Sequence, residues 1–211
     1  IVGGTGVMGT SAIRAIREHF DQNSVIVANW YGKESPGFQI EGADNTIFGD
    51  INDPNCRNKI KSFNNGSFDY MFYATALGDV GIPIKDATKD QIIRSNKLSF
   101  DPIPQLENEL SIETTVAYST FYTIRHQLST YGAMGHSKEN IEKWAVETDG
   151  TSKHACIRAG LFESPSSRGI KLLLRKTSKN LDNLKDPLLR SYFENSPSSE
   201  GIKKFVEGIF K

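Results

Sequence analysis

Three glycines, each three residues from the next, stand at the start of the chain and constrain its fold more than any other feature. They are Gly3, Gly6 and Gly9 in the opening IVGGTGVMG. The two residues before them are apolar, residues 11–20 carry apolar side chains at helical spacing, and residues 25–29 form a short apolar run. This order of strand, glycine turn, helix and strand predicts the first βαβ unit of a parallel sheet.

The glycine segment has the features of a phosphate-binding loop. Glycine permits a tight turn, lets the backbone approach a pyrophosphate and lets the helix pack close to the strand. The first N–H groups of the helix add the positive end of its dipole. We therefore expect a dinucleotide to contact Gly3, Thr5, Gly6, Val7, Met8 and Gly9. The alternative is an ordinary tight turn.

Short apolar runs continue along the chain and alternate with polar or helical stretches. The runs span residues 46–48, 70–76, 114–119 and 154–160. Helical patterns cover residues 86–98, with Thr88 or Asp86 as N-cap, and residues 137–146. Such alternation predicts an α/β fold, a doubly wound parallel sheet of Rossmann-like type. We expect one domain over residues 1–211, in which residues 165–196 form a short C-terminal lid and GIKKFVEGIF forms a closing helix.

Composition excludes several classes of function. Lys+Arg and Asp+Glu both number 25, so no basic field is available to attract nucleic acid or an anionic membrane. No apolar run approaches the roughly 18 residues of a membrane span. Cys56, Cys156 and the four histidines are scattered without metal-ligand or disulfide spacing. We expect a cytoplasmic protein that binds no metal, no nucleic acid and no membrane.

The end of the second predicted strand bears on the choice of cofactor. An acidic residue there would bind the adenosine ribose of NAD, but the sequence has Asn29, Trp30, Tyr31, Gly32 and Lys33. With no carboxylate to repel a 2′-phosphate and Lys33 nearby to attract one, NADP(H) is favoured over NAD(H). Trp30 or Tyr31 can stack on adenine or pack at the sheet edge, and Lys33 can equally be a solvated loop residue.

In this order of motifs, the chain resembles the short-chain dehydrogenase/reductase superfamily over roughly residues 1–210. The resemblance rests on the glycine loop, on Asp50 in GDIND and on Tyr131-Gly-Ala-Met-Gly-His-Ser-Lys138. It implies catalytic roles for Tyr131, Lys138, Ser119 and Asn96. It implies cofactor contacts from Asn29, Trp30, Lys33, Asp50, Ile51, Ala74, Thr75, Ala76, Lys138, Gly160, Phe162 and Ser164.

The spacing of tyrosine and lysine departs from the commonest family pattern. Position 135 is glycine, so Tyr-x-x-x-Lys fails, and the motif is Tyr-x6-Lys, similar to the enoyl-acyl-carrier-protein reductases. Seven residues return to within about 20° on a helix, which predicts that Lys138 lies on the face of Tyr131. A phenol can protonate a developing oxyanion when a nearby ammonium lowers its pKa from about 10. Ser119, or its neighbour Thr120, is expected to hydrogen-bond the substrate oxygen.

These motifs predict an NADP(H)-dependent oxidoreductase that transfers a hydride to or from a small carbonyl/alcohol or enoyl substrate. Phe121 stands where the enoyl reductases have a second tyrosine, and Ala74-Thr75-Ala76 replaces the usual Asn-Asn-Ala-Gly. The alternatives are a non-catalytic NADP(H)-binding regulator or scaffold and a reductase module of a larger polypeptide. The first predicted strand is unusually short, which favours a loss of residues before it. The resemblance favours a loss of residues at the C-terminal end as well. It also implies a homodimer or homotetramer.

Overall fold

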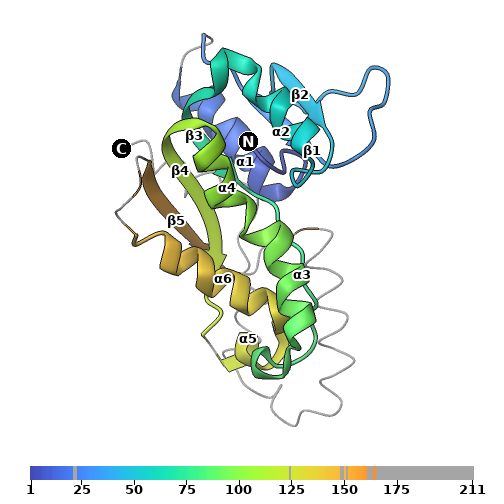
Figure 1. Cartoon of the computed structure of the whole chain (residues 1–211), viewed down its shortest axis with the longest axis vertical. Helices are drawn as coiled ribbons and strands as arrows, with labels where there is room; N and C mark the ends of the chain where they lie inside the picture. The colour runs from blue at the N-terminus through green and yellow to red at the C-terminus, as the bar shows by residue number, and fades with distance from the viewer. Residues whose placement is uncertain (21–22, 124, 148–149, 151, 161–163, 165–211) are drawn as a thin grey trace.

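The structure is a computed structural model that describes residues 1–20, 23–123, 125–147, 150, 152–160 and 164 (Figure 1). Among these residues no helix is long and apolar enough to cross a membrane. The predicted lid over 165–196 and the closing helix lie outside the described residues. The elements in chain order are α1 (Val7–His19), β1 (Val27–Trp30), β2 (Asn45–Phe48), α2 (Pro54–Lys61), η1 (Phe63–Gly66), β3 (Ser67–Tyr73), η2 (Ile84–Asp86), α3 (Lys89–Ser99), α4 (Pro102–Glu109), β4 (Ser111–Thr120), α5 (Arg125–Thr130), α6 (Gly132–Trp144) and β5 (Lys153–Ala159).

Every strand pairing among the described residues is parallel. β1 pairs with β2, while β4 lies between β3 and β5. Val2 joins the two parts, because it forms parallel bridges to Asn29 and to Tyr73. Its N–H donates to the Phe72 carbonyl (2.9 Å), and its own carbonyl accepts from Ala74 N–H (2.8 Å). The order β2-β1-Val2-β3-β4-β5 is that of a doubly wound sheet, which confirms the predicted fold class.

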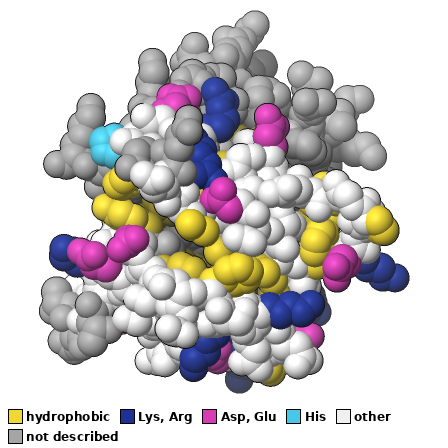
Figure 2. Space-filling model, turned by 90° about the horizontal axis from the view of Figure 1, so that it is seen from above, with side chains coloured by type: hydrophobic (Ala, Val, Ile, Leu, Met, Phe, Trp, Pro, Cys, Tyr) yellow, Lys and Arg dark blue, Asp and Glu magenta, His cyan; other side chains and the backbone are white. Residues whose placement is uncertain are grey.

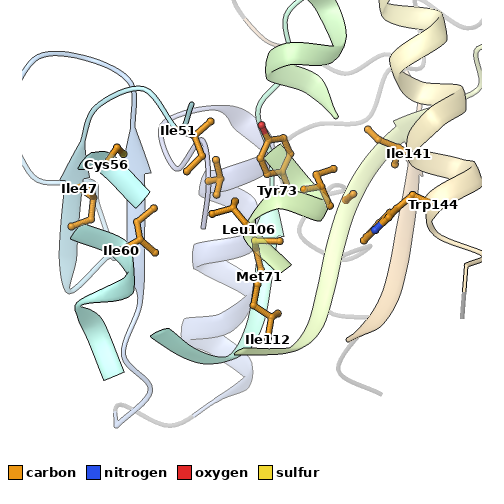
Figure 3. Close-up of a cluster of buried hydrophobic side chains, with 13 residues drawn as sticks. Ile47, Ile51, Cys56, Ile60, Met71, Tyr73, Leu106, Ile112, Ile141 and Trp144 are labelled. Carbon is orange, nitrogen blue, oxygen red and sulfur yellow. The ribbon is translucent and has the colours of Figure 1, made fainter. Parts of the chain in front are cut away.

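Two hydrophobic clusters cover the two faces of the sheet. The first packs α2, α4 and α6 against inward side chains such as Met71 and Tyr73, and Figure 3 shows these lying beside Leu106. The second packs α1 against Phe72 and Val116, residues of β3 and β4 that are 0% exposed. Because alternate residues of one strand serve opposite faces, β3 and β4 are buried on both sides, as the parallel arrangement requires.

Capping residues determine where several helices begin. Thr88 caps α3 in a capping box with Gln91, which selects it over Asp86 as the N-cap. Asp53 accepts from Asn55 N–H (2.9 Å) at the start of α2, and Pro54 is the first residue of that helix. The predicted helix over 137–146 begins earlier, at Gly132, and the predicted strand over 70–76 ends at Tyr73.

Candidate active site

The glycine loop lies at the carboxyl edge of the sheet and is held by backbone contacts. Gly3 and Gly4 N–H both donate to the Asn29 carbonyl (3.2 and 3.0 Å). Gly3 has φ +83°, and a Cβ on it would lie 3.1 Å from the Ala74 carbonyl. A Cβ on Gly9 would lie 2.2 Å from Gly3 O, so only glycine allows α1 to start this close to the first strand. The loop therefore abuts Ala74 and Thr75, as a shared cofactor site requires.

The N-terminus of α1 is open to a ligand. Gly6 is its N-cap, the first turn contains no acidic residue, and Thr5 and Gly6 are exposed. Among the described residues, a Cβ on Gly6 would meet no atom closer than Gly3 O at 3.7 Å, which leaves room for a ligand beside this glycine. The first N–H groups of a helix lack intrahelical acceptors and attract anions. These residues fit the pyrophosphate of a dinucleotide.

The residues at and just after the end of β1 differ in their contacts and exposure. Asn29 is buried, and its Nδ2 donates to Ile47 O (3.2 Å) and Gly49 O (3.1 Å), so its amide ties β1 to β2. Trp30 packs on Phe38, with ring centroids 4.5 Å apart, which favours the packing alternative for this side chain. Lys33 is exposed.

The GDIND segment, residues 49–53, contains a turn that hydrogen bonds from Asn52 and Arg57 hold in place. Asp50 is exposed, and its Oδ1 accepts from the backbone N–H (2.9 Å) and Nδ2 (3.0 Å) of Asn52. Ile51 is buried, and its carbonyl accepts from Arg57 Nη1 (3.0 Å). Arg57 also donates to Asn52 O (2.8 Å) and to Glu109 Oε2 (2.8 Å) while only 6% exposed. Sequence reasoning missed Arg57, because its partners include a carboxylate 52 residues away.

Serines of α3 and α6 support the segment that follows β3. Leu77 N–H donates to Ser99 Oγ, and Leu77 O accepts from Ser95 Oγ (both 2.8 Å). Ser95 also bonds Ser137 across the α3–α6 contact (2.8 Å). Half-buried Asn96 accepts from Ser137 Oγ through its Oδ1 (2.8 Å), so its side-chain oxygen is bonded to α6. Ala76, just before this anchored residue, is exposed.

Lys138 places a cation at the end of β4. Its side chain is 6% exposed, and its Nζ donates to the Tyr118 carbonyl (2.7 Å). Burial lowers the pKa of this amine to about 8, with a smaller opposing effect from Cys156. The amine therefore stays mainly protonated at neutral pH, and a hydrogen-bond acceptor brought to it would stabilise the charge.

The helical-face prediction for Tyr131 is wrong in its geometry. Tyr131 is the N-cap of α6 and precedes its first residue, and its N–H donates to the carbonyl of Gln127 in α5 (2.8 Å). Gly132 follows with φ +51°, a left-handed conformation that breaks the helix between Tyr131 and Lys138. A Cβ on Gly132 would lie 2.1 Å from Asp79 O. The side chain of Tyr131 is half-buried at this junction.

Two further predicted residues, Ser119 and Gly160, lie at the ends of β4 and β5. Ser119 is buried and donates to Glu142 Oε1 (2.7 Å), an α6 carboxylate that sequence reasoning did not select. Half-buried Gly160 follows β5, and Ser164 is also half-buried. Phe162 lies outside the described residues. Within the described part of the chain, no group of three His, Cys, Asp or Glu side chains can hold a metal ion.

A cavity of about 920 Å³ lies toward the opposite, amino edge of the strands, and its lining reaches Val2 and Asn29. Its lining includes Phe20, Val25, Phe68 and Tyr70, and Figure 2 shows hydrophobic side chains around a hollow on this end of the molecule. Ligands of doubly wound folds bind at the carboxyl ends of the strands. We therefore assign the candidate site to the carboxyl edge and not to this cavity.

Comparison with solved structures identifies the fold. The KRED1-Pglu enzyme is similar with a TM-score of 0.68 and 13% identity, over 99% of this chain and 92% of that one. A short-chain dehydrogenase from Streptomyces avermitilis has a TM-score of 0.66 and 13% identity, over 100% and 82%. YwfH, an NADPH-dependent reductase involved in bacilysin biosynthesis, has a TM-score of 0.66 and 12% identity, over 100% and 89%.

No family model matches the sequence, and the curated proteins contain no significant match. At such low identity, the structural likeness establishes the fold alone. The chain has the Rossmann-like fold of the short-chain dehydrogenases/reductases.

Proposed function

We propose that this protein is an NADP(H)-dependent oxidoreductase that transfers a hydride to or from a small carbonyl/alcohol or enoyl substrate. The observation that carries the proposal is the buried ammonium of Lys138 at the end of β4, on the same sheet edge as the open glycine loop. Lysine is almost never fully buried unless it is paired, and buried groups with shifted pKa values cluster at functional sites.

The described residues fit a dinucleotide along this edge. The loop from Gly3 to Gly9 would hold the pyrophosphate, Asp50 and Ile51 the adenine, and Ala74 to Ala76 the middle of the cofactor. Lys138 would bind the nicotinamide ribose, and Gly160 and Ser164 the nicotinamide end. When bound, the cofactor supplies or accepts the hydride.

Tyr131 is the proposed acid/base. Its phenol would donate a proton to the substrate oxygen as negative charge develops there, and the Lys138 ammonium would favour the ionised phenol that remains. The two side chains come from either side of the break at Gly132, so this junction sets their relative position.

Preference for NADP(H) is proposed from charge at the end of β1. No acidic side chain occupies positions 29–33, and exposed Lys33 can attract a 2′-phosphate. YwfH, one of the structural neighbours, is described as NADPH-dependent, which is consistent with this choice.

The test separates cofactor binding from chemistry. We expect Tyr131→Phe to bind NADPH as the wild type does but to lose at least about a hundredfold in reduction of a panel of aldehydes, ketones and enoyl thioesters. Lys138→Met should weaken both properties. Lys143→Met is the matched control, because Lys143 is 66% exposed on the same helix and pairs with Glu139.

Each outcome of this experiment has a defined meaning. Unchanged turnover in Tyr131→Phe would refute its acid/base role. Tight NADPH binding by the wild type with no turnover on any substrate of the panel would favour the regulator or scaffold alternative. If NADPH does not bind, the cofactor proposal is wrong.

A further inference from the structure

Two adjacent hydroxyl groups at the end of β4 have different hydrogen-bonding roles. Ser119 Oγ donates to Glu142 Oε1 at 2.7 Å, and its contact with the Thr120 carbonyl is much longer, at 3.4 Å. Arg158 fixes the carboxylate from the other side, with Nε 2.8 Å from Oε1 and Nη2 2.5 Å from Oε2. A serine hydroxyl has a single proton, and a carboxylate is the stronger acceptor. The Ser119 proton is therefore committed to Glu142.

Glu142, which accepts the hydrogen bond of Ser119, lies toward the C-terminal end of α6. Glu142 lies ten residues after Gly132, which corresponds to about 15 Å along a helix. Its side chain is 14% exposed, and Arg158 comes from β5. This arrangement connects β4, α6 and β5. Its geometry is that of a structural clamp.

Thr120 has the opposite arrangement. Gln127 Nε2 donates to Thr120 Oγ1 at 3.0 Å, and both side chains are buried, at 5% and 6% exposure. An amide N–H can only donate, so it occupies a lone pair of the threonine oxygen and leaves the threonine proton available to another acceptor. The same Gln127 accepts Tyr131 N–H through its backbone carbonyl at 2.8 Å. One residue thus links Thr120 to the segment that carries Tyr131.

We propose that Thr120, and not Ser119, donates the hydrogen bond to the substrate oxygen, and that Gln127 is the positioning residue that directs this donation. The inference rests on the proposed function, since it concerns the same site. It resolves the choice between two hydroxyls that the sequence left open, and it gives Glu142 and Arg158 a structural role.

The experiment measures binding of butyramide to the complex of the full chain with NADPH. An amide carbonyl accepts hydrogen bonds as a ketone does but resists hydride, so the readout does not depend on turnover. We expect Thr120→Val, which keeps the shape of the side chain, to weaken butyramide binding about tenfold. Thr120→Ser should restore it, and Ser119→Ala should change it less than about twofold. NADPH binding should be equal in all four proteins.

A second variant tests the positioning role of Gln127. In Gln127→Glu an ionised carboxylate would accept the Thr120 proton, so butyramide binding should fall about tenfold near pH 8. A buried carboxyl has a raised pKa, so binding should recover toward about pH 5, where the protonated carboxyl donates again. A purely structural role for Gln127 predicts no such recovery. Thermal unfolding of each variant verifies that it is folded.

The results distinguish this inference from the proposed function. If the wild type binds no NADPH, the proposed function fails. If it binds NADPH but Ser119→Ala loses butyramide and Thr120→Val keeps it, the assignment of the donor is overturned. Equal effects of both variants, or no butyramide binding to the wild-type complex, also overturn it.

Discussion

The two ends of the candidate site are held together by different kinds of contact. At the glycine loop, the backbone N–H groups of Gly3 and Gly4 bond the Asn29 carbonyl, and Thr10 Oγ1 adds a longer bond to the Gly4 carbonyl (3.3 Å). At the end of β4, side chains make the contacts, through the bond of Lys138 to Tyr118 O and the Ser119–Glu142–Arg158 clamp. In the glycine loop a substitution acts through the space that its added Cβ needs, which Gly9 lacks and Gly6 has, whereas at the end of β4 a substitution removes one interaction at a time.

The largest effect is expected for Gly9→Ala, in the glycine loop that backbone contacts hold together. Its Cβ would lie 2.2 Å from Gly3 O and 2.8 Å from Gly4 Cα, and neither neighbour is a flexible side chain. We expect a loss of more than about 4 kcal/mol in the free energy of unfolding measured in urea. Gly6→Ala is the control, since its nearest atom is 3.7 Å away, and it should lose under about 1 kcal/mol. Equal stabilities would show that the loop is not close-packed.

Arg57→Met should produce the next largest effect. The change removes hydrogen bonds to two loop carbonyls and to Glu109, which leaves the buried carbonyl of Ile51 without this donor. We expect a loss of about 3 kcal/mol in urea unfolding. Arg94→Met removes an ion pair whose side chains are 67% and 51% exposed, and it should cost less than about 1 kcal/mol. Similar losses for both arginines would contradict the anchoring role.

Lys138→Met should stabilise the protein at neutral pH, in contrast to the two losses above. Burial lowers the lysine pKa from 10.5 to about 8, so the charged amine opposes folding. Removing it should gain about 2 kcal/mol at pH 7, after allowance for the lost bond to Tyr118 O. Between pH 8 and 10.5 the unfolded wild type holds a proton that the native state has released, so wild-type stability rises with pH.

The measurement is the difference between the unfolding free energies of the two proteins from pH 7 to about 10.5. The advantage of Lys138→Met should shrink over this range as the wild type is relieved of the buried charge. A constant difference would show that Lys138 titrates normally.

The smallest effect is expected at exposed Lys33, at the proposed nucleotide-binding end of the site. Lys33→Glu should weaken NADPH binding about tenfold and leave NADH binding nearly unchanged, because only NADPH carries a 2′-phosphate. Lys97→Glu changes an exposed lysine of α3 and controls for the change in net charge. Fluorescence titration with both nucleotides provides the dissociation constants. Equal weakening of both nucleotides would place Lys33 away from the 2′-position.

The same difference between backbone contacts and side-chain contacts explains what could be predicted from the sequence. The glycine loop, its strand and its helix occupy one short stretch, so local spacing was sufficient to predict α1 and β1 and the fold class. The helices α2 and α4 were missed, although Pro54 and Pro102 at their first turns are recognised start signals.

The side-chain half could not be predicted in the same way. Ser119, Glu142 and Arg158 are brought together only when β4, α6 and β5 pack, and no local pattern specifies which hydroxyl meets which carboxylate. The helical-wheel argument for Tyr131 and Lys138 failed because one glycine, Gly132, adopts a positive φ that spacing alone does not reveal.

The most direct test of the nucleotide site is calorimetric titration of NADPH into the wild type and Gly6→Ala. Gly6 is the exposed N-cap of α1, and a methyl group there makes an ordinary contact with Gly3 O (3.7 Å) but occupies the space where the pyrophosphate would lie. We predict stoichiometric binding to the wild type and at least about tenfold weaker binding to a variant that is equally well folded. Equal binding to both proteins, or none to the wild type, would contradict the assignment.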